Sequence, residues 1–148
     1  MIQEVTMLRF IVSLVLLLAS IVGAIVFEGG NPLAYIGAAA FMIELLVPLF
    51  AMLAVWRLAE IGHAFGDAFS KKADSTSRAR SARIWEFTEK ICYAAGLIGL
   101  ILGAVLILSR IYGSVAELGH GLALSLVALL YGVMFGIVCR ILKARVEM

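Results

Sequence analysis

The sequence predicts an all-α integral membrane protein with four transmembrane helices. Of the 148 residues, 64% are hydrophobic, a share that exceeds what soluble domains show, and the mean hydropathy is +1.09. A helix of about 20 apolar residues crosses a hydrocarbon core of roughly 30 Å. Stretches of this kind occupy residues 7–27, 32–56, 91–109 and 120–142. We therefore expect a single membrane domain over residues 1–148, with no room for a soluble enzyme core.

The distribution of positive charge predicts the orientation of these spans. Four crossings place the N-terminus, the loop 57–90 and the C-terminus on one side, and this side carries every lysine and arginine except Arg110. Cytoplasmic loops carry an excess of such residues. We therefore expect a multi-pass protein of a bacterial-type inner (cytoplasmic) membrane, with both termini in the cytoplasm and short outer loops at residues 28–31 and 110–119.

Residues 57–90 are expected to extend the second and third spans into the cytoplasm as helices. Apolar residues recur there at steps of three and four, as on one face of a helix: Leu58, Ile61, Phe65 and Phe69. The second span is therefore predicted to continue past the membrane. Ser75, Thr76 or Ser77 is expected to cap a new helix that runs through Ile84 and Phe87 into the third span.

Residues 71–83, KKADSTSRARSAR, form a basic tract with five cations and one anion. One interpretation is a solvated turn whose charges fix the topology of the chain. The alternative is contact with anionic lipid headgroups, worth about 1 kcal/mol for each nearby cation. On that alternative, lipids are partners of the chain.

Small residues line one face of each of the last two spans. Gly96, Gly99 and Gly103 share a face with Leu100, because these positions follow the i, i+3, i+4, i+7 pattern. The fourth span repeats the arrangement with Gly121, Ser125, Ala128, Gly132 and Gly136. Apolar burial does not drive helices together inside a bilayer, so small faces act by letting backbones approach closely. We expect these spans to pack tightly against each other or against copies of themselves.

Glu44, in the segment FMIELLVPLF, lies near the middle of the second span. An ionised acid at that depth costs about 2.5–3.5 kcal/mol on insertion scales, so it requires a partner or a proton. Pro48 lies four residues later and leaves the carbonyl of Glu44 without its helical hydrogen bond. Two interpretations stand side by side: Glu44 handles an ion or a proton, or it is a protonated residue that hydrogen-bonds within the bundle.

No set of residues in the sequence predicts catalysis or a metal centre. Ser-His-Asp, HExxH, P-loop and paired-carboxylate patterns do not occur, so no catalytic residue is assigned and the chain is not expected to be an enzyme. Cys92 and Cys139 lack metal-ligand spacing and are interpreted as small packing residues. No metal, cofactor or nucleic acid is expected.

Three stretches resemble MotA-type stator subunits of the MotA/ExbB/TolQ proton-channel superfamily. IVFEGGNPLAYIG, which holds Glu28, Gly29 and Gly30, is similar to the family's apolar-EGG turn at the outer end of the first span. GLIGLILGAVLILSRI is similar to the GLIGTVLGLI core of the third span, and LGHGLALSLVALLYGVMFGIV to the LGPGIAVALLTTLYG fourth span. The stretches follow the family's order, and four spans with internal termini favour the MotA branch. The chain resembles a shortened and divergent member.

The resemblance implies a homopentamer whose third and fourth spans line a central hole. A MotB/ExbD/TolR-like partner with a single span would occupy that hole and carry a membrane aspartate that accepts the ion. The resemblance makes Glu28, Gly29 and Gly30 a periplasmic turn motif. It assigns these residues to the pore or the partner: Gly99, Leu100, Gly103, Ser125, Ala128, Leu129 and Gly132.

The chain departs from the resembled pattern where the family carries polar groups. Leu100 stands where the GLIGT core has threonine, and Ala128 and Leu129 stand where paired threonines precede LYG. His120 replaces the proline of LGPG. Apolar side chains cannot stabilise a dehydrated ion as hydroxyls do, and the loop 57–90 is much shorter than the part that MotA uses to push a flagellar rotor. Flagellar torque and sodium selectivity are therefore not expected.

Two functions follow from these observations. The first is a MotA-like pentameric subunit of a proton-driven inner-membrane motor or energy-transducing complex, in which Leu100, Ser125, Ala128 and Leu129 face the single-span partner. Glu44 is a separate candidate for ion or proton handling. The second is a structural membrane ring or scaffold of the same fold that conducts nothing.

Overall fold

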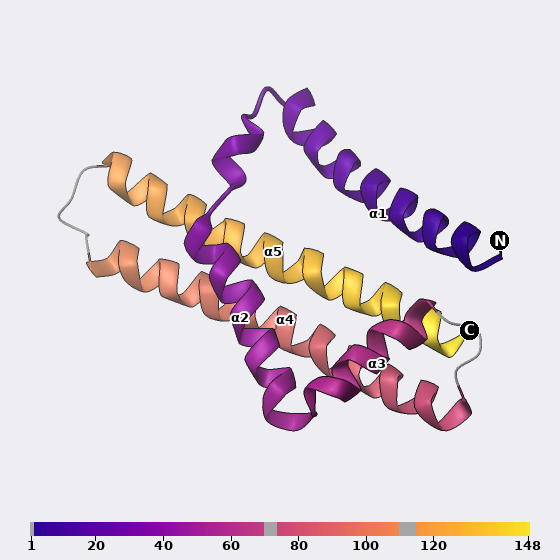
Figure 1. Ribbon diagram of the computed structural model, residues 1–148. Helices are drawn as coiled ribbons and strands as arrows, with labels where there is room; N and C mark the ends of the chain where they lie inside the picture. Colours follow the sequence, from indigo (N-terminus) through magenta and orange to yellow (C-terminus); the bar gives the residue numbers. More distant parts are fainter. Residues whose placement is uncertain (1, 70–73, 110–114) are drawn as a thin grey trace.

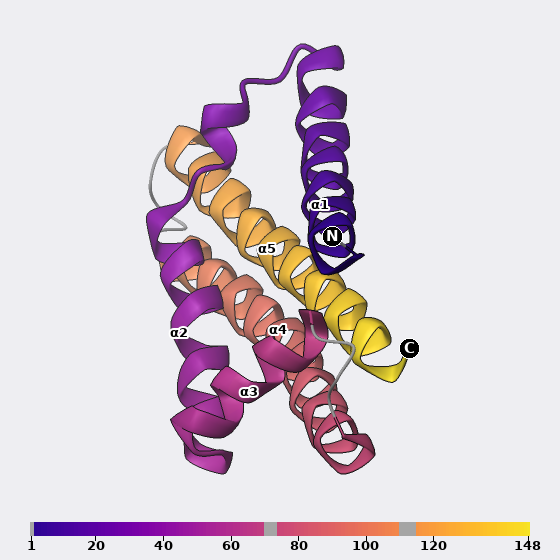
Figure 2. The same cartoon turned by 45° about the vertical axis from the view of Figure 1, so that its right-hand side comes forward.

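The computed structural model describes residues 2–69, 74–109 and 115–148, and the regular elements in these ranges are all helices (Figure 1). In chain order they are α1 (Ile2–Phe27), the 3₁₀ helix η1 (Pro32–Tyr35), α2 (Ala38–Val55), α3 (Leu58–Phe69), α4 (Ser75–Ser109) and α5 (Val115–Glu147). α4 and α5 run side by side in opposite directions, and both chain termini lie at one end of the molecule, which we call the terminal end (Figure 2). Half of the predicted outer loop at 110–119, and residues 71–73 of the basic tract, lie outside the described residues.

Three of the described helices are long and apolar enough to cross a membrane. They are α1 over Met7–Phe27, α4, and α5 over Gly121–Glu147. The bent pair α2–α3 raises the number of crossings to four if it forms one broken span. The prediction of an all-α, multi-pass membrane protein is confirmed, and the predicted second span, 32–56, lies in this bent pair.

The prediction that the second span continues past the membrane as one helix is wrong. A helix from Leu58 does form, but it turns from α2 by 111°. Trp56 is extended, with φ −123° and ψ 153°, and the Glu60 carboxylate accepts a hydrogen bond of 3.0 Å from the backbone N–H of Arg57, which begins a new helix. The bend lays one face of α3 onto α4, and this face buries Ile61, Ala64 and Ala68. No proline or glycine lies at the break between α2 and α3. The helical periodicity of the apolar residues therefore could not predict the bend.

The second apolar segment also begins later than predicted. Residues 32–35 form η1, in which Asn31 Oδ1 accepts a hydrogen bond of 3.0 Å from the N–H of Leu33. Pro32 opens this turn because its fixed φ suits a first helical position. α2 begins only at Ala38 and has 18 residues, which at 1.5 Å per residue gives about 27 Å. That length is slightly less than the hydrocarbon core of a typical bilayer.

α1 ends at the EGG turn through a glycine cap. Gly29 has a φ of 75°, a left-handed conformation that glycine adopts without a side-chain clash. Its N–H donates to the carbonyl of Val26 at 3.0 Å, and the N–H of Gly30 donates to the carbonyl of Ile25 at 2.8 Å. This is the Schellman pattern of a helix end. The EGG segment is therefore a helix stop made by backbone hydrogen bonds.

α4 is one helix of 35 residues, so the predicted helix that runs through Ile84 and Phe87 into the third span is confirmed. It begins at Ser75, and the N–H of Arg78 donates to the carbonyl of Asp74 at 2.9 Å. Serines of its first turns serve the tertiary structure. The hydroxyls of Ser77 and Ser81 both donate to Oδ2 of Asp67 in α3, at 2.6 and 2.7 Å.

Bulky side chains pack at the terminal end, where α3 meets α4 and α5, and we call this region the terminal core. Its buried members include Met52, Ile61, Ile84, Trp85, Leu142 and Val146. The indole N–H of Trp85 donates to the carbonyl of Ala64 at 3.3 Å, and Nε of Arg145 donates to the carbonyl of Ala68 at 3.1 Å. The Arg145 guanidinium also lies 4.9 Å from the ring centre of Phe10. This contact ties α1 to the bundle, whereas no residue in the apolar stretch of α1 is buried.

Candidate functional site

α4 and α5 meet along the two small-residue faces that the sequence predicts, and we call this contact the glycine seam. A Cβ atom on Gly132 would lie 2.8 Å from the Cα of Gly96, and one on Gly99 would lie 2.5 Å from the Cβ of Ala128. Further pairs are Gly103 with Ser125, Gly121 with Ile107, and Gly136 with the ring of Tyr93. The prediction that the third and fourth spans pack against each other is confirmed. Close backbone approach, which small residues permit, occurs here within one chain.

The side chain of Glu44 reaches from α2 into the glycine seam. Its Oε1 lies 3.0 Å from the place that a Cβ on Gly132 would take and 3.4 Å from the place of a Cβ on Gly96. Glu44 is 2% exposed, and neither carboxyl oxygen has a hydrogen-bond partner in the part of the chain that the structure describes. α2 therefore places an unpartnered acid at a point where the two backbones of the hairpin approach closely.

The residues that the resemblance assigns to the pore or the partner fall into two groups. Five of them are buried in the glycine seam of a single chain, namely Gly99, Gly103, Ser125, Ala128 and Gly132. The other two, Leu100 and Leu129, keep part of their surface exposed. Within one chain, these two leucines are the members of the set whose side chains are not fully buried. The pore-facing role of the set stays a prediction.

Two hydroxyl groups on α5 already bind backbone carbonyls of the same chain. Oγ of Ser125 donates to the carbonyl of Gly121 at 2.8 Å, and Oη of Tyr131 donates to the carbonyl of Tyr35 in η1. The second bond joins α5 to the segment that follows the EGG turn. Sequence reasoning missed this contact, because the two residues are 96 positions apart and neither belongs to a motif that marks the pairing.

Cys92 and Cys139 are buried beside the seam. The two side chains are neighbours, Cys92 on α4 and Cys139 on α5. Both cysteines belong to the terminal core, in keeping with the packing role predicted for them. Among the described residues, no group of three or more histidine, cysteine, aspartate or glutamate side chains could hold a metal ion.

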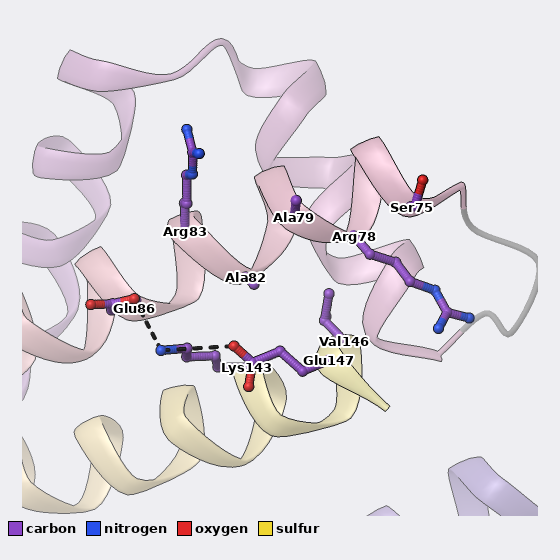
Figure 3. Close-up of a pocket in the computed structure, with 9 residues that line it drawn as sticks. All are labelled: Ser75, Arg78, Ala79, Ala82, Arg83, Glu86, Lys143, Val146 and Glu147. Atoms are coloured by element: carbon purple, nitrogen blue, oxygen red, sulfur yellow. Dashed lines mark hydrogen bonds and ion pairs between the residues drawn. The ribbon is translucent and has the colours of Figure 1, made fainter.

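A pocket of about 440 Å³ lies at the terminal end between α4 and α5 (Figure 3). Its lining comprises Ser75, Arg78, Ala79, Ala82, Arg83, Glu86, Lys143, Val146 and Glu147. Arg78 and Arg83 point in different directions, whereas Lys143 approaches Glu86 at 3.0 Å and Glu147 at 3.9 Å (Figure 3). Because these cations do not converge, the pocket is not shaped around one anion. Contact of the basic tract with lipid headgroups stays a prediction.

Helices that can cross a membrane and an apolar hairpin joined through glycines define a multi-pass α-helical membrane protein. A sequence model of the MotA/TolQ/ExbB proton channel family matches residues 59–147, which is more than half of the chain. The chain belongs to this family, and the resemblance found in the sequence is confirmed. The match makes it a proton-channel-type membrane protein and includes α4 and α5, whereas Glu44 and the EGG turn lie outside the matched residues. No curated protein and no solved structure gives a significant match.

Proposed function

We propose that the chain is the pore-forming, MotA-like subunit of a proton-driven complex in the inner membrane. It assembles as a homopentamer around a MotB/ExbD/TolR-like partner with a single span and a membrane aspartate. The observation that carries this proposal is the family match over α3, α4 and α5. The glycine seam supports it, because a tightly joined hairpin is a rigid unit from which a ring can be built.

The outer surface of the hairpin suits contact with other apolar helices and with lipid. Large apolar side chains remain exposed on it, among them Leu97, Ile101, Leu102, Leu126 and Val133. The small faces that permit close helix packing are already occupied within the subunit. Neighbouring subunits would therefore contact one another through larger side chains.

Both termini would lie in the cytoplasm, on the side of the membrane that the positive charges predict.

On this proposal, Leu100 and Leu129 face the partner helix, and the small residues of the seam lie behind them and set the spacing of α4 and α5. An apolar wall offers no oxygen ligands to a dehydrated metal cation. A proton needs no such shell, because it binds covalently to a carboxylate. The partner's aspartate would therefore carry the ion, and the ion would be a proton.

The test is a reconstitution in two stages. Native mass spectrometry of the detergent-purified complex should give five copies of this chain with a co-purified single-span protein that has a membrane aspartate. Liposomes that contain this complex should dissipate a pH gradient, and replacing the partner's aspartate by asparagine should stop the flux. A stable monomer, or liposomes that remain tight with every partner tried, would reject the proposal.

A variant of Leu100 tests the partner-facing surface. Leu100→Thr restores the side chain of the resembled family at a partly buried position, so we expect an altered proton flux with no loss of folding. Leu102→Thr is the matched control, because two residues turn a helix by about 200° and place this exposed leucine on another side. Equal effects of the two variants would remove the partner-facing role from Leu100.

A second candidate function is a membrane ring or scaffold that conducts nothing. The hydroxyls of Ser125 and Tyr131 already bind carbonyls of this chain, and the positions of three family threonines hold Leu100, Ala128 and Leu129. These observations favour a pathway without polar lining. Five copies with no proton flux, with or without a partner, would select this function.

A further inference from the structure

We propose that Glu44 is a proton-binding site inside the subunit, and that its proton holds α2 onto the glycine seam. Loss of the proton releases α2 from α4 and α5. This inference does not rest on the partner or on the ring, because every residue involved belongs to one chain. It concerns a residue outside the part of the chain that matches the family.

The burial of Glu44 is the first step of the argument. An ionised carboxylate that is 2% exposed, with neither oxygen hydrogen-bonded among the described residues, loses its hydration and gains nothing in return. A buried and unpaired charge of this kind costs far more free energy than a neutral carboxyl group that lacks a hydrogen bond. Glu44 is therefore protonated when α2 is packed against α4 and α5.

The surroundings of the carboxyl group identify the ligand as a proton. α2 carries no second titratable residue. On α4, Cys92 lies close enough to feel the charge of Glu44, and the neighbour of Cys92 on α5 is Cys139. Neither supplies a positive charge. Hard metal cations take about six oxygen ligands, and a carboxyl group against glycine backbone offers too few.

The glycines explain why this site is sensitive to the position of α2. Oε1 of Glu44 occupies the space over Gly132 and Gly96 that side chains would otherwise fill. The carboxyl group therefore fits at this position because both helices carry a glycine there. A small outward movement of α2 takes the carboxyl group off the two glycines and parts Ala40 from its neighbours on α5. It leaves α4 and α5 together, because the other pairs of the seam join these two helices directly.

α2 runs into non-helical residues at both ends, while its last turn stays packed in the terminal core through Met52, so the movement is a tilt. Gly37, before its first turn, is extended with φ −104° and ψ 105°, and Trp56, after its last turn, is extended as well. Figures 1 and 2 show α2 crossing the hairpin as a separate rod between η1 and α3. Non-helical residues at the ends of a rigid element are the usual hinges of a tilting motion.

The first measurement is infrared spectroscopy of the chain alone in lipid vesicles, as the pH is raised. We expect the carbonyl band of a protonated carboxylic acid that disappears on titration, that is missing in Glu44→Gln, and that is intact in Glu28→Gln, which removes an exposed acid of the outer turn. A band that persists in Glu44→Gln, or no band at any pH, overturns the proposal.

The second measurement follows the position of α2 through the reactivity of Cys92, which is 3% exposed. A neutral thiol reagent labels Cys92 in two proteins, Cys139→Ala and Cys139→Ala with Glu44→Gln. At each pH the labelling rate of the first is divided by that of the second, so that the ordinary pH dependence of the thiol cancels. This ratio should rise by up to about tenfold per pH unit while the released state is minor, because one proton leaves. A negative charge on Glu44 by itself disfavours the thiolate, so it cannot produce this rise.

A ratio that stays flat across the pH range in which the infrared band disappears overturns the release of α2. If Glu44→Gln does not fold, Glu44→Leu serves as the reference, because it fills the same space without polar atoms. Neither measurement requires a partner or proton flux. Failure here therefore leaves the proposed channel function standing, and failure of the flux assay leaves this proposal standing.

Discussion

The two halves of the α4–α5 hairpin are held together in opposite ways. Toward the terminal end, Ile84, Trp85 and Val146 are almost completely buried, and polar side chains add hydrogen bonds between helices. In the other half, glycine, alanine and serine bring the backbones together, while leucines such as Leu97 and Leu102 point outward and stay exposed. One half resembles the core of a soluble protein, and the other is typical of helices that associate in lipid.

The difference between the two halves shows where the hydrophobic effect acts in this molecule. Large side chains gain from burial only where the alternative is water, as expected for helices that emerge from the membrane. Where the alternative is lipid, the same side chains gain little from facing inward, so the inner positions go to residues that permit close contact. Glu44 lies where the two halves of the hairpin meet. Its carboxyl group contacts Gly96 and Gly132 of the seam and lies near Cys92 of the terminal core.

The largest expected effect comes from emptying the terminal core. Ile84→Ala removes a side chain that is 0% exposed, and such truncations cost about 2–5 kcal/mol of unfolding free energy. Leu97→Ala is the control in the other half, where the side chain is 52% exposed and little change is expected. Denaturant unfolding in detergent micelles measures both, and equal losses would contradict the distinction between the two halves.

The next largest effect comes from filling the glycine seam. Gly132→Ala places a methyl group 2.8 Å from the Cα of Gly96 and 2.8 Å from the carbonyl oxygen of Cys92. Because backbone cannot move aside cheaply, we expect a loss of about 1–3 kcal/mol, as for other overpacked sites. Gly66→Ala on α3 meets nothing within 4 Å and should raise stability slightly, since alanine favours a helix by about 1 kcal/mol. Thermal unfolding of the two variants should shift in opposite directions.

A smaller effect is expected from the polar contacts of the terminal end. Asp67→Asn replaces a charged acceptor of two hydroxyls, those of Ser77 and Ser81, by a neutral one, which should cost about 1 kcal/mol. Ser81→Ala should cost less in the Asp67→Asn background than in the wild type, because the two residues share one hydrogen bond. Strict additivity in this double-mutant cycle would show that the bond does not contribute to stability.

The smallest effect is expected from the surface ion pair. Arg80 lies 3.1 Å from Glu60, and the arginine side chain is 60% exposed, so Arg80→Gln should cost about 0–1 kcal/mol, and less at high salt. Arg83→Gln removes a neighbouring exposed arginine as the matched control. A loss as large as that of Ile84→Ala would mean that charge, rather than packing, holds the terminal end together.

The class of this protein and the contact between its third and fourth spans could both be predicted from the sequence. Length and hydropathy predict membrane helices, and the glycine spacing predicts the contact between the third and fourth spans, because both depend on patterns within single helices. The family resemblance also placed the EGG turn, and in the structure Gly29 has the left-handed conformation that ends α1 there. The family match over residues 59–147 confirms the resemblance and includes its third- and fourth-span stretches, whereas the EGG turn lies outside the match.

The end of the second span and the surroundings of Glu44 depend on how the helices pack against one another. No helix-breaking residue marks the bend at Trp56, because that bend follows from the packing of α3 on α4. The sequence placed Glu44 at mid-membrane depth and required for it a partner or a proton, but the two glycines that receive its carboxyl group lie 52 and 88 positions further along the chain. Periodicity describes one helix at a time, whereas the environment of a buried acid is set by three helices that meet at one point.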